Sequence, residues 1–128
     1  MTEKELKDRT KSFALRVIKL VSSLPNNAAG KAIGNQLIRS GTSVAANYRA
    51  ACRGRSKAEF ISKLGIVEEE ADESCLWLEL IIESDLMEEK LVASLLKEAN
   101  ELTAIFVSSR ISAKQNKEIA NRQSKIAN

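Results

Sequence analysis

Apolar residues recur along the chain at spacings of three and four, which is typical of amphipathic helices with one buried side. The repeat breaks near Pro25, near Gly54 and around residues 84–87. Each break carries a signal for a helix end. Pro25 cannot donate a helical hydrogen bond, Gly54 suits a left-handed helix terminus, and Asp85 can cap the helix that follows. The pattern therefore predicts four helices.

Each predicted helix has its own stripe of core positions. The first stripe is Leu6, Thr10, Phe13, Val17, Leu20, Val21 and Leu24, and the second, on a helix from about 28 to 53, is Ala29, Ile33, Leu37, Ser40, Val44, Asn47 and Ala51. The third follows a capping box at residues 56–59 and is Phe60, Leu64, Val67, Ala71, Cys75, Leu78 and Ile82. The fourth is Leu91, Leu95, Leu102, Ile105, Phe106 and Ser109.

Four amphipathic helices with short connections predict an all-α fold, an antiparallel up-down-up-down four-helix bundle over residues 1–111. Beyond Ile111 the sequence is polar and loses its periodicity. Residues 112–128 are therefore expected to form a basic extension that is frayed or disordered. Neither a membrane-spanning run nor an apolar leader is recognisable, so a cytoplasmic protein without membrane contact is expected.

Charge is divided unevenly along the chain, although the net charge is only +3. Residues 1–64 carry 13 basic and 4 acidic side chains, residues 65–108 carry 2 basic and 12 acidic ones, and residues 109–128 carry 5 basic and 1 acidic one. Such asymmetry indicates either a polyanionic partner or association of oppositely charged faces between copies.

The residue inventory excludes several kinds of catalytic site. The chain has no histidine, so it has neither a Ser-His or Cys-His nucleophile pair nor a histidine metal ligand. Cys52 and Cys75 are isolated and are expected to be small buried residues in a reducing compartment. No cofactor, metal or small-molecule substrate is expected.

A basic stripe follows the outer side of the second predicted helix and continues through the next turn. Cations spaced along a helix of about 40 Å suit the phosphates of RNA or DNA, and a solvated helix face is the alternative. No aromatic residue accompanies the stripe, so binding would have little sequence specificity. The candidate nucleic-acid-binding residues are Lys31, Arg39, Arg49, Arg53, Arg55 and Lys57.

The third predicted helix carries a second apolar stripe away from its core side. A tryptophan with several aliphatic residues is typical of a surface that binds a partner, and scattered surface hydrophobics are the alternative. The expected homo-oligomer interface is Ile66, Leu76, Trp77 and Leu80.

Residues 36–50 (QLIRSGTSVAANYRA) and 53–61 (RGRSKAEFI) resemble the bacterial four helix bundle protein family, which includes proteins encoded in intervening sequences of 23S rRNA genes. The acidic run EEEADES at 68–74 and WLEL at 77–80 are similar to one branch of it, and the family is itself similar to the accessory protein of diversity-generating retroelements. The resemblance covers about residues 8–110. It implies a ring-like homopentamer, a nucleic-acid role and no enzymatic activity.

The matching motif positions are Arg39, Ser40, Ser43, Asn47, Arg53, Ser56 and Phe60, and Glu59 completes the capping box. Many family members have Glu-Gly where this chain has Ala50-Ala51, so any polar task of that glutamate is absent here. Ser40, Ser43 and Asn47 lie on or beside the buried side of their helix, where they are expected to bond carbonyls or pair across helices.

Two alternatives to nucleic-acid binding remain from the residues. One is a scaffold that binds only proteins, itself included. The remote one is a Mg²⁺-dependent nucleotide pyrophosphohydrolase, for which the carboxylates of Glu69, Glu70, Asp72 and Glu73 would have to converge inside the bundle.

Overall fold

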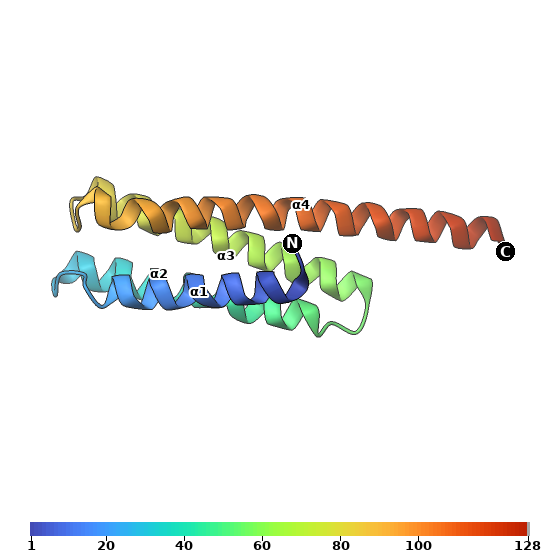
Figure 1. Ribbon diagram of the computed structural model, residues 1–128, viewed down its shortest axis with the longest axis horizontal. Helices are drawn as coiled ribbons and strands as arrows, with labels where there is room; N and C mark the ends of the chain where they lie inside the picture. Colours follow the sequence, from blue (N-terminus) through green and yellow to red (C-terminus); the bar gives the residue numbers. More distant parts are fainter. Residues whose placement is uncertain (128) are drawn as a thin grey trace.

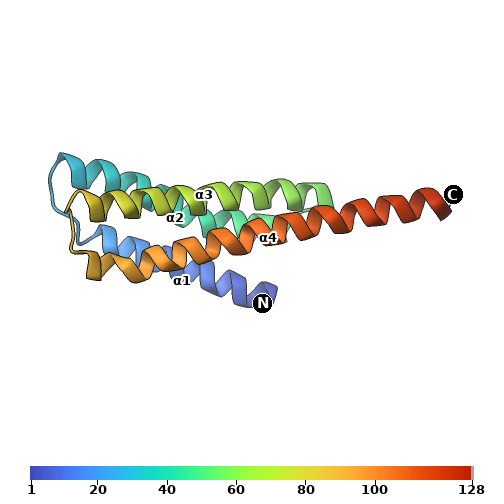
Figure 2. The same cartoon turned by 90° about the horizontal axis from the view of Figure 1, so that it is seen from above.

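The computed structural model describes residues 1–127 and has four helices in an antiparallel bundle (Figures 1 and 2). They are α1 (Glu3–Val21), α2 (Ala28–Cys52), α3 (Lys57–Glu83) and α4 (Glu89–Ala127). Helix α1 packs on α2, α2 on α3 and α3 on α4, and a smaller contact between α1 and α4 closes the bundle. The all-α four-helix fold is confirmed. No helix in residues 1–127 is long and apolar enough to cross a bilayer.

Side-chain caps begin the first three helices, because the first amides of a helix have no partner within it. Thr2 accepts from the Glu5 amide at 3.1 Å, and Asn27 accepts from the Gly30 amide at 2.8 Å. Ser56 accepts from the Glu59 amide at 3.1 Å, and the Glu59 carboxylate reaches back to the amide of Arg55 at 3.0 Å. The capping box is therefore present, but the Glu59 carboxylate bonds the amide of Arg55, one residue before the cap residue Ser56.

The core is apolar and runs the length of the bundle, with contributions from all four helices. Most of the expected stripe is buried, but in three helices one position is displaced by one residue. In α2 the buried residue is Gly30, and the expected Ala29 is exposed. In α3 the fully buried residue is Ile81 rather than Ile82, and in α4 it is Val92, whereas Leu91 is 60% exposed. Adjacent residues lie 100° apart on a helix, so the rotation of a helix about its axis decides which of two apolar neighbours is buried.

Three helix ends differ from the sequence-based expectation. Helix α1 ends at Val21 and not at Leu24, four residues before the first break signal at Pro25. Gly54 is not left-handed. The last turn of α2 is a tighter, 3₁₀-type turn instead, in which the Gly54 amide donates to the Ala51 carbonyl at 3.0 Å. The left-handed residue is instead Asp85, with φ 59°, where the amide of Leu86 bonds the carbonyl of Ile81.

The segment 112–127, expected to be frayed or disordered, is helical in the structure and continues α4 past the end of the bundle (Figures 1 and 2). It contains neither proline nor glycine and consists largely of strong helix formers such as Ala, Lys and Gln. Intrinsic propensity therefore extends the helix where the core pattern has already ended.

Glycines on α2 bring α1 close. A Cβ at Gly41 would lie 2.8 and 2.9 Å from the two methyl carbons of Val17, which is fully buried. A Cβ at Gly34 would lie 3.1 Å from a methyl carbon of Val21. The α1–α2 spacing therefore depends on the absence of side chains on this face of α2.

Substitution by alanine separates this packing role from helix propensity. Gly65 is a control in the interior of α3, because a Cβ there would meet only the Arg110 side chain at 3.9 Å. Gly65→Ala should raise the free energy of unfolding by about 0.5–1 kcal/mol, the usual gain in a helix interior. The free energy of unfolding of Gly41→Ala should be about 1–3 kcal/mol lower than that of Gly65→Ala, because the new methyl group overpacks against Val17. Urea unfolding measures both, and equal stabilisation would contradict the close-packing account.

A basic groove between α1 and α2

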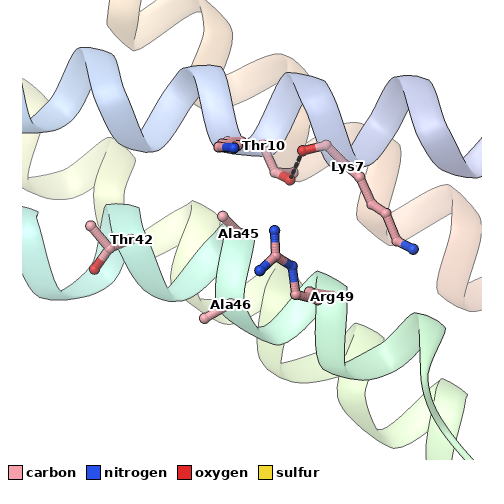
Figure 3. A pocket seen from close by; sticks show the side chains of 7 residues that line it. Lys7, Thr10, Thr42, Ala45, Ala46 and Arg49 are labelled. Atoms are coloured by element: carbon pink, nitrogen blue, oxygen red, sulfur yellow. Dashed lines mark hydrogen bonds between the residues drawn. The ribbon is translucent and has the colours of Figure 1, made fainter.

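A shallow groove of about 350 Å³ lies between α1 and α2 (Figure 3). Ala45 and Ala46 of α2 have short side chains, which leave space between the longer side chains of the lining. Figure 3 shows the Arg49 guanidinium in the gap between the two helices and the Lys7 side chain extending from α1. The lining residues are Lys7, Thr10 and Lys11 of α1 with Thr42, Ala45, Ala46 and Arg49 of α2.

The groove is positively charged and its hydroxyls are already engaged. Lys7 lies 3.6 Å from Glu3 on the exposed surface, and no carboxylate in residues 1–127 lies within 4 Å of Lys11 or Arg49. The Thr10 hydroxyl donates to the Lys7 carbonyl at 3.0 Å, and the Thr42 hydroxyl donates to the Ile38 carbonyl at 2.6 Å. The cations are therefore the groups with capacity to bind an anion here.

Sequence reasoning placed Arg49 among the candidates but missed Lys7 and Lys11. The available signal was their spacing of four, which puts both on one side of the first helix. Their convergence with Arg49 depends on how α1 and α2 are rotated against each other, which a helical wheel for a single helix does not contain.

The other expected basic residues fall into three groups. Arg39 pairs with Glu70 at 3.3 Å and with Glu73 of α3, and the hydrogen bond to Glu73 raises the pKa of the guanidinium. Its charge is neutralised within the chain. Lys31 lies at the opposite end of α2, about 27 Å from Arg49 along the axis.

Arg53, Arg55 and Lys57 are exposed at the turn between α2 and α3. Arg55 and Lys57 line a hollow of about 460 Å³, together with Glu3 from the start of α1. Because Glu3 precedes Lys7 by one helical turn, the hollow and the basic groove follow one another along α1. The cations of the turn therefore neighbour the groove along α1, with the Glu3 carboxylate between the two.

The motif residues of α2 form polar contacts inside the bundle. Ser40 and Ser74 share a hydrogen bond of 2.9 Å between α2 and α3 with both side chains fully buried. The Asn47 amide donates to the Ser43 carbonyl at 2.9 Å, and Ser43 is half-buried. Phe60 packs against the core. The Ser40–Ser74 bond joins α2 to α3, whereas the Asn47 bond satisfies a polar group within α2.

The expected interface residues of α3 are unequally exposed. Leu76 is 46% and Leu80 36% exposed. Ile66 and Trp77 are half-buried, and Trp77 also packs against the core while its Nε1 donates to Glu73 at 3.3 Å. An apolar surface on α3 therefore remains, centred on the two leucines.

The carboxylates considered for a Mg²⁺ site do not gather inside the bundle. Glu70 and Glu73 bind Arg39, and Glu69 and Asp72 are exposed. Within residues 1–127, no three His, Cys, Asp or Glu side chains lie close enough together to hold a metal ion. The structure therefore gives no geometric support to the pyrophosphohydrolase alternative.

Tyr48 and Cys52 are titratable groups close to Glu3 at the start of α1, and both are neutral at pH 7. Burial, together with the Cys52 thiol, raises the pKa of Tyr48 well above its ordinary value of about 10. Burial also raises the pKa of Cys52. Neither group therefore places a negative charge beside Lys7.

Because the pKa of Tyr48 is raised, the free energy of unfolding depends on pH in the alkaline range. The unfolded chain loses the phenol proton near pH 10 and the folded chain only at higher pH, so stability falls as pH rises above about 10. Because Tyr48 is the sole tyrosine, tyrosinate absorbance at 295 nm should rise together with the loss of the helical circular-dichroism signal. Tyrosinate formation near pH 10 in a fully helical protein would contradict this burial.

Comparison with known proteins places this geometry in a family. Residues 3–108 match the family described as 23S rRNA-intervening sequence protein. A solved structure from Bacteroides thetaiotaomicron VPI-5482, described as a protein with unknown function from the S23 ribosomal protein family, is 34% identical with a TM-score of 0.79. The match covers 86% of this chain and 98% of that one. No curated protein matches. The chain belongs to the 23S rRNA-intervening sequence protein family.

Proposed function

We propose that this protein binds the phosphate backbone of RNA or DNA through the basic groove and the adjacent α2–α3 turn, as a homo-oligomer and without catalysis. The observation that carries the proposal is the division of its arginines. Those facing acidic helices are paired, Arg9 with Glu98 and Glu101 and Arg110 with Glu68. The cations of the groove and the turn have no such partner across a helix boundary within residues 1–127.

Phosphates suit this surface better than a small acidic ligand does. The groove is open and shallow, and its cations and those of the turn are spread along α1 and α2 instead of converging on one point, with Glu3 the one carboxylate among the lining residues of the described part of the chain. Such an arrangement neutralises successive phosphates and releases their counterions. The groove lining contains no aromatic side chain, so contacts to base faces are not expected and sequence preference should be weak. The family description itself refers to 23S rRNA intervening sequences.

Removing two groove cations tests this proposal. Lys11→Gln with Arg49→Gln should weaken binding to a 30-nucleotide RNA and reduce the steepness of log K against log[NaCl] by about 1.4–1.8, the value for two lost phosphate contacts. Lys90→Gln with Lys97→Gln is the matched control, because it removes two exposed cations of α4 that do not line the groove. Fluorescence anisotropy at several salt concentrations gives the slopes. Equal slopes for the two double variants would contradict the groove assignment.

Self-association is proposed from two apolar surfaces of opposite charge. The first is the outer side of α3, where Leu76 and Leu80 are flanked at helical spacing by Asp72, Glu79 and Glu83. The second is a groove of about 420 Å³ between α1 and α4, whose apolar lining includes Leu20, Leu91 and Leu95.

The α1–α4 groove complements the α3 surface in charge. Arg16 and Lys19 line it, and the exposed Leu15 and Ile18 lie beside it on α1. Two different surfaces that fit each other make a head-to-tail contact, which closes into a ring when the rotation between copies permits. This geometry supports the ring-like homo-oligomer, a pentamer by family resemblance.

Assembly should depend on the exposed leucines of α3. Leu76→Ser with Leu80→Ser should convert an oligomer at micromolar concentration into a monomer without loss of helix, because both side chains are exposed in the single chain. Sedimentation velocity measures the mass. The control, Ile119→Ser with Ile126→Ser, removes two exposed apolar residues far along α4 and should leave the mass unchanged.

The pairing of the two surfaces has its own test. Lys19→Glu should weaken assembly, and adding Glu79→Lys should restore it. A monomeric wild-type protein would contradict self-association altogether. An oligomer with no affinity for RNA or DNA would instead favour the protein-only scaffold.

A further inference from the structure

The C-terminal extension of α4 is an addition to the fold that the family shares. The family match ends at residue 108, and the solved relative is matched over 98% of its own length by only 86% of this chain. The bundle is therefore complete without the extension. Yet residues 112–127 continue α4 as a helix that projects beyond the α2–α3 turn (Figures 1 and 2).

The extension carries its cations on one side. At 100° per residue, Lys114, Lys117 and Lys125 fall within a sector of about 80°, with Asn121 between them. Arg122 lies about 60° outside this sector, and Glu118, the single carboxylate among residues 112–127, lies about 20° from Lys125 on the same side. The isoleucines Ile119 and Ile126 lie on the other side of the helix. The basic stripe is thus a property of the helical conformation and does not depend on composition alone.

The stripe begins at the end of the bundle where the proposed nucleic-acid surface ends. Lys114, Lys117 and Glu118 line a groove of about 390 Å³ with Ala58, Ile61 and Ser62 of α3. Ala58 directly follows Lys57, the last cation of the α2–α3 turn. Arg110, at the inner end of this groove, is paired with Glu68 at 2.6 Å. Positive charge without an acidic partner on another helix therefore resumes at Lys114.

We propose that the extension is a second phosphate-binding arm, which follows the backbone of the same nucleic acid beyond the bundle. Lys114 and Lys125 are separated by about 16 Å along the helix, which corresponds to about five phosphates along one strand of a B-form duplex at 3.4 Å each. The inference rests on the proposed nucleic-acid function and extends it to a segment outside the shared fold. The nucleic acid is favoured as occupant because the stripe continues the basic surface of the turn.

Two double variants of equal charge test the arm. Lys114→Gln with Lys117→Gln lowers the net charge by two on the basic side, and Gln115→Glu with Gln123→Glu lowers it by two on other sides of the same helix. With a 30-nucleotide RNA, the lysine variant should lose about 1.4–1.8 from the steepness of log K against log[NaCl], and the glutamine variant should keep the wild-type slope. Circular dichroism checks that both remain helical.

The other outcomes overturn the proposal in distinguishable ways. Equal changes in the two variants would mean that net charge alone matters. An unchanged slope in the lysine variant, with wild-type RNA binding intact, would remove the arm and leave the groove proposal standing. Loss of assembly in sedimentation at unchanged RNA affinity would assign the stripe to a second copy. If the lysine variant kept its RNA affinity but lost binding to vesicles of phosphatidylcholine and phosphatidylserine, the stripe would be assigned to a membrane surface. Absence of wild-type RNA binding would overturn both proposals.

Discussion

The close approach of α1 and α2 is the constraint on which the basic surface depends. Gly41 faces the Val17 methyl groups, and Gly34 faces Val21, so α1 lies on a strip of α2 that has no side chains. With larger residues there, the helices would separate and the cations of the two helices would no longer share one groove. The same approach buries Val17 and Phe13 completely. Packing of the core and presentation of charge are thus two results of one contact.

Ion pairs across helix boundaries then determine which arginines are available. Arg9 on α1 makes two hydrogen bonds to Glu98 on α4, at 2.6 and 2.8 Å, and a third to Glu101. Arg39 joins α2 to α3, and Arg110 joins α4 to α3. Loss of a partner costs most where the pair is least exposed, which is the Arg9–Glu98 pair, whereas the more exposed Arg39 pairs contribute less to stability. The acidic helices therefore neutralise the arginines that face them and leave the α1–α2 side positive.

The sequence predicted the architecture because the features that set it are local. Core spacing and the capping box at Ser56 depend on residues within a few positions of each other. The choice of Val92 over Leu91 was not predictable in this way, because it depends on how α4 is rotated towards its neighbours. Fraying was expected after Ile111 because the core stripe ends there, but the Ala-, Lys- and Gln-rich segment is helical.

The candidate site was only partly predictable because it lies between helices. Arg49 was found from its place on α2, but Lys7 and Lys11 enter only when α1 is laid against α2. Arg39 looked equivalent to Arg49 on the helical wheel, and the position of Glu70 and Glu73 on the neighbouring helix separates the two. The opposite charges of distant segments indicated either a polyanionic partner or association between copies of the chain. The structure shows that some of these opposite charges pair within one chain.

The most direct test of the central claim is the salt dependence of wild-type binding to a short RNA. Six cations in the groove and the turn predict a slope of log K against log[NaCl] of about −4 or steeper, because each neutralised phosphate contributes about 0.7–0.9. A slope near zero, or no binding at low salt, would contradict the account.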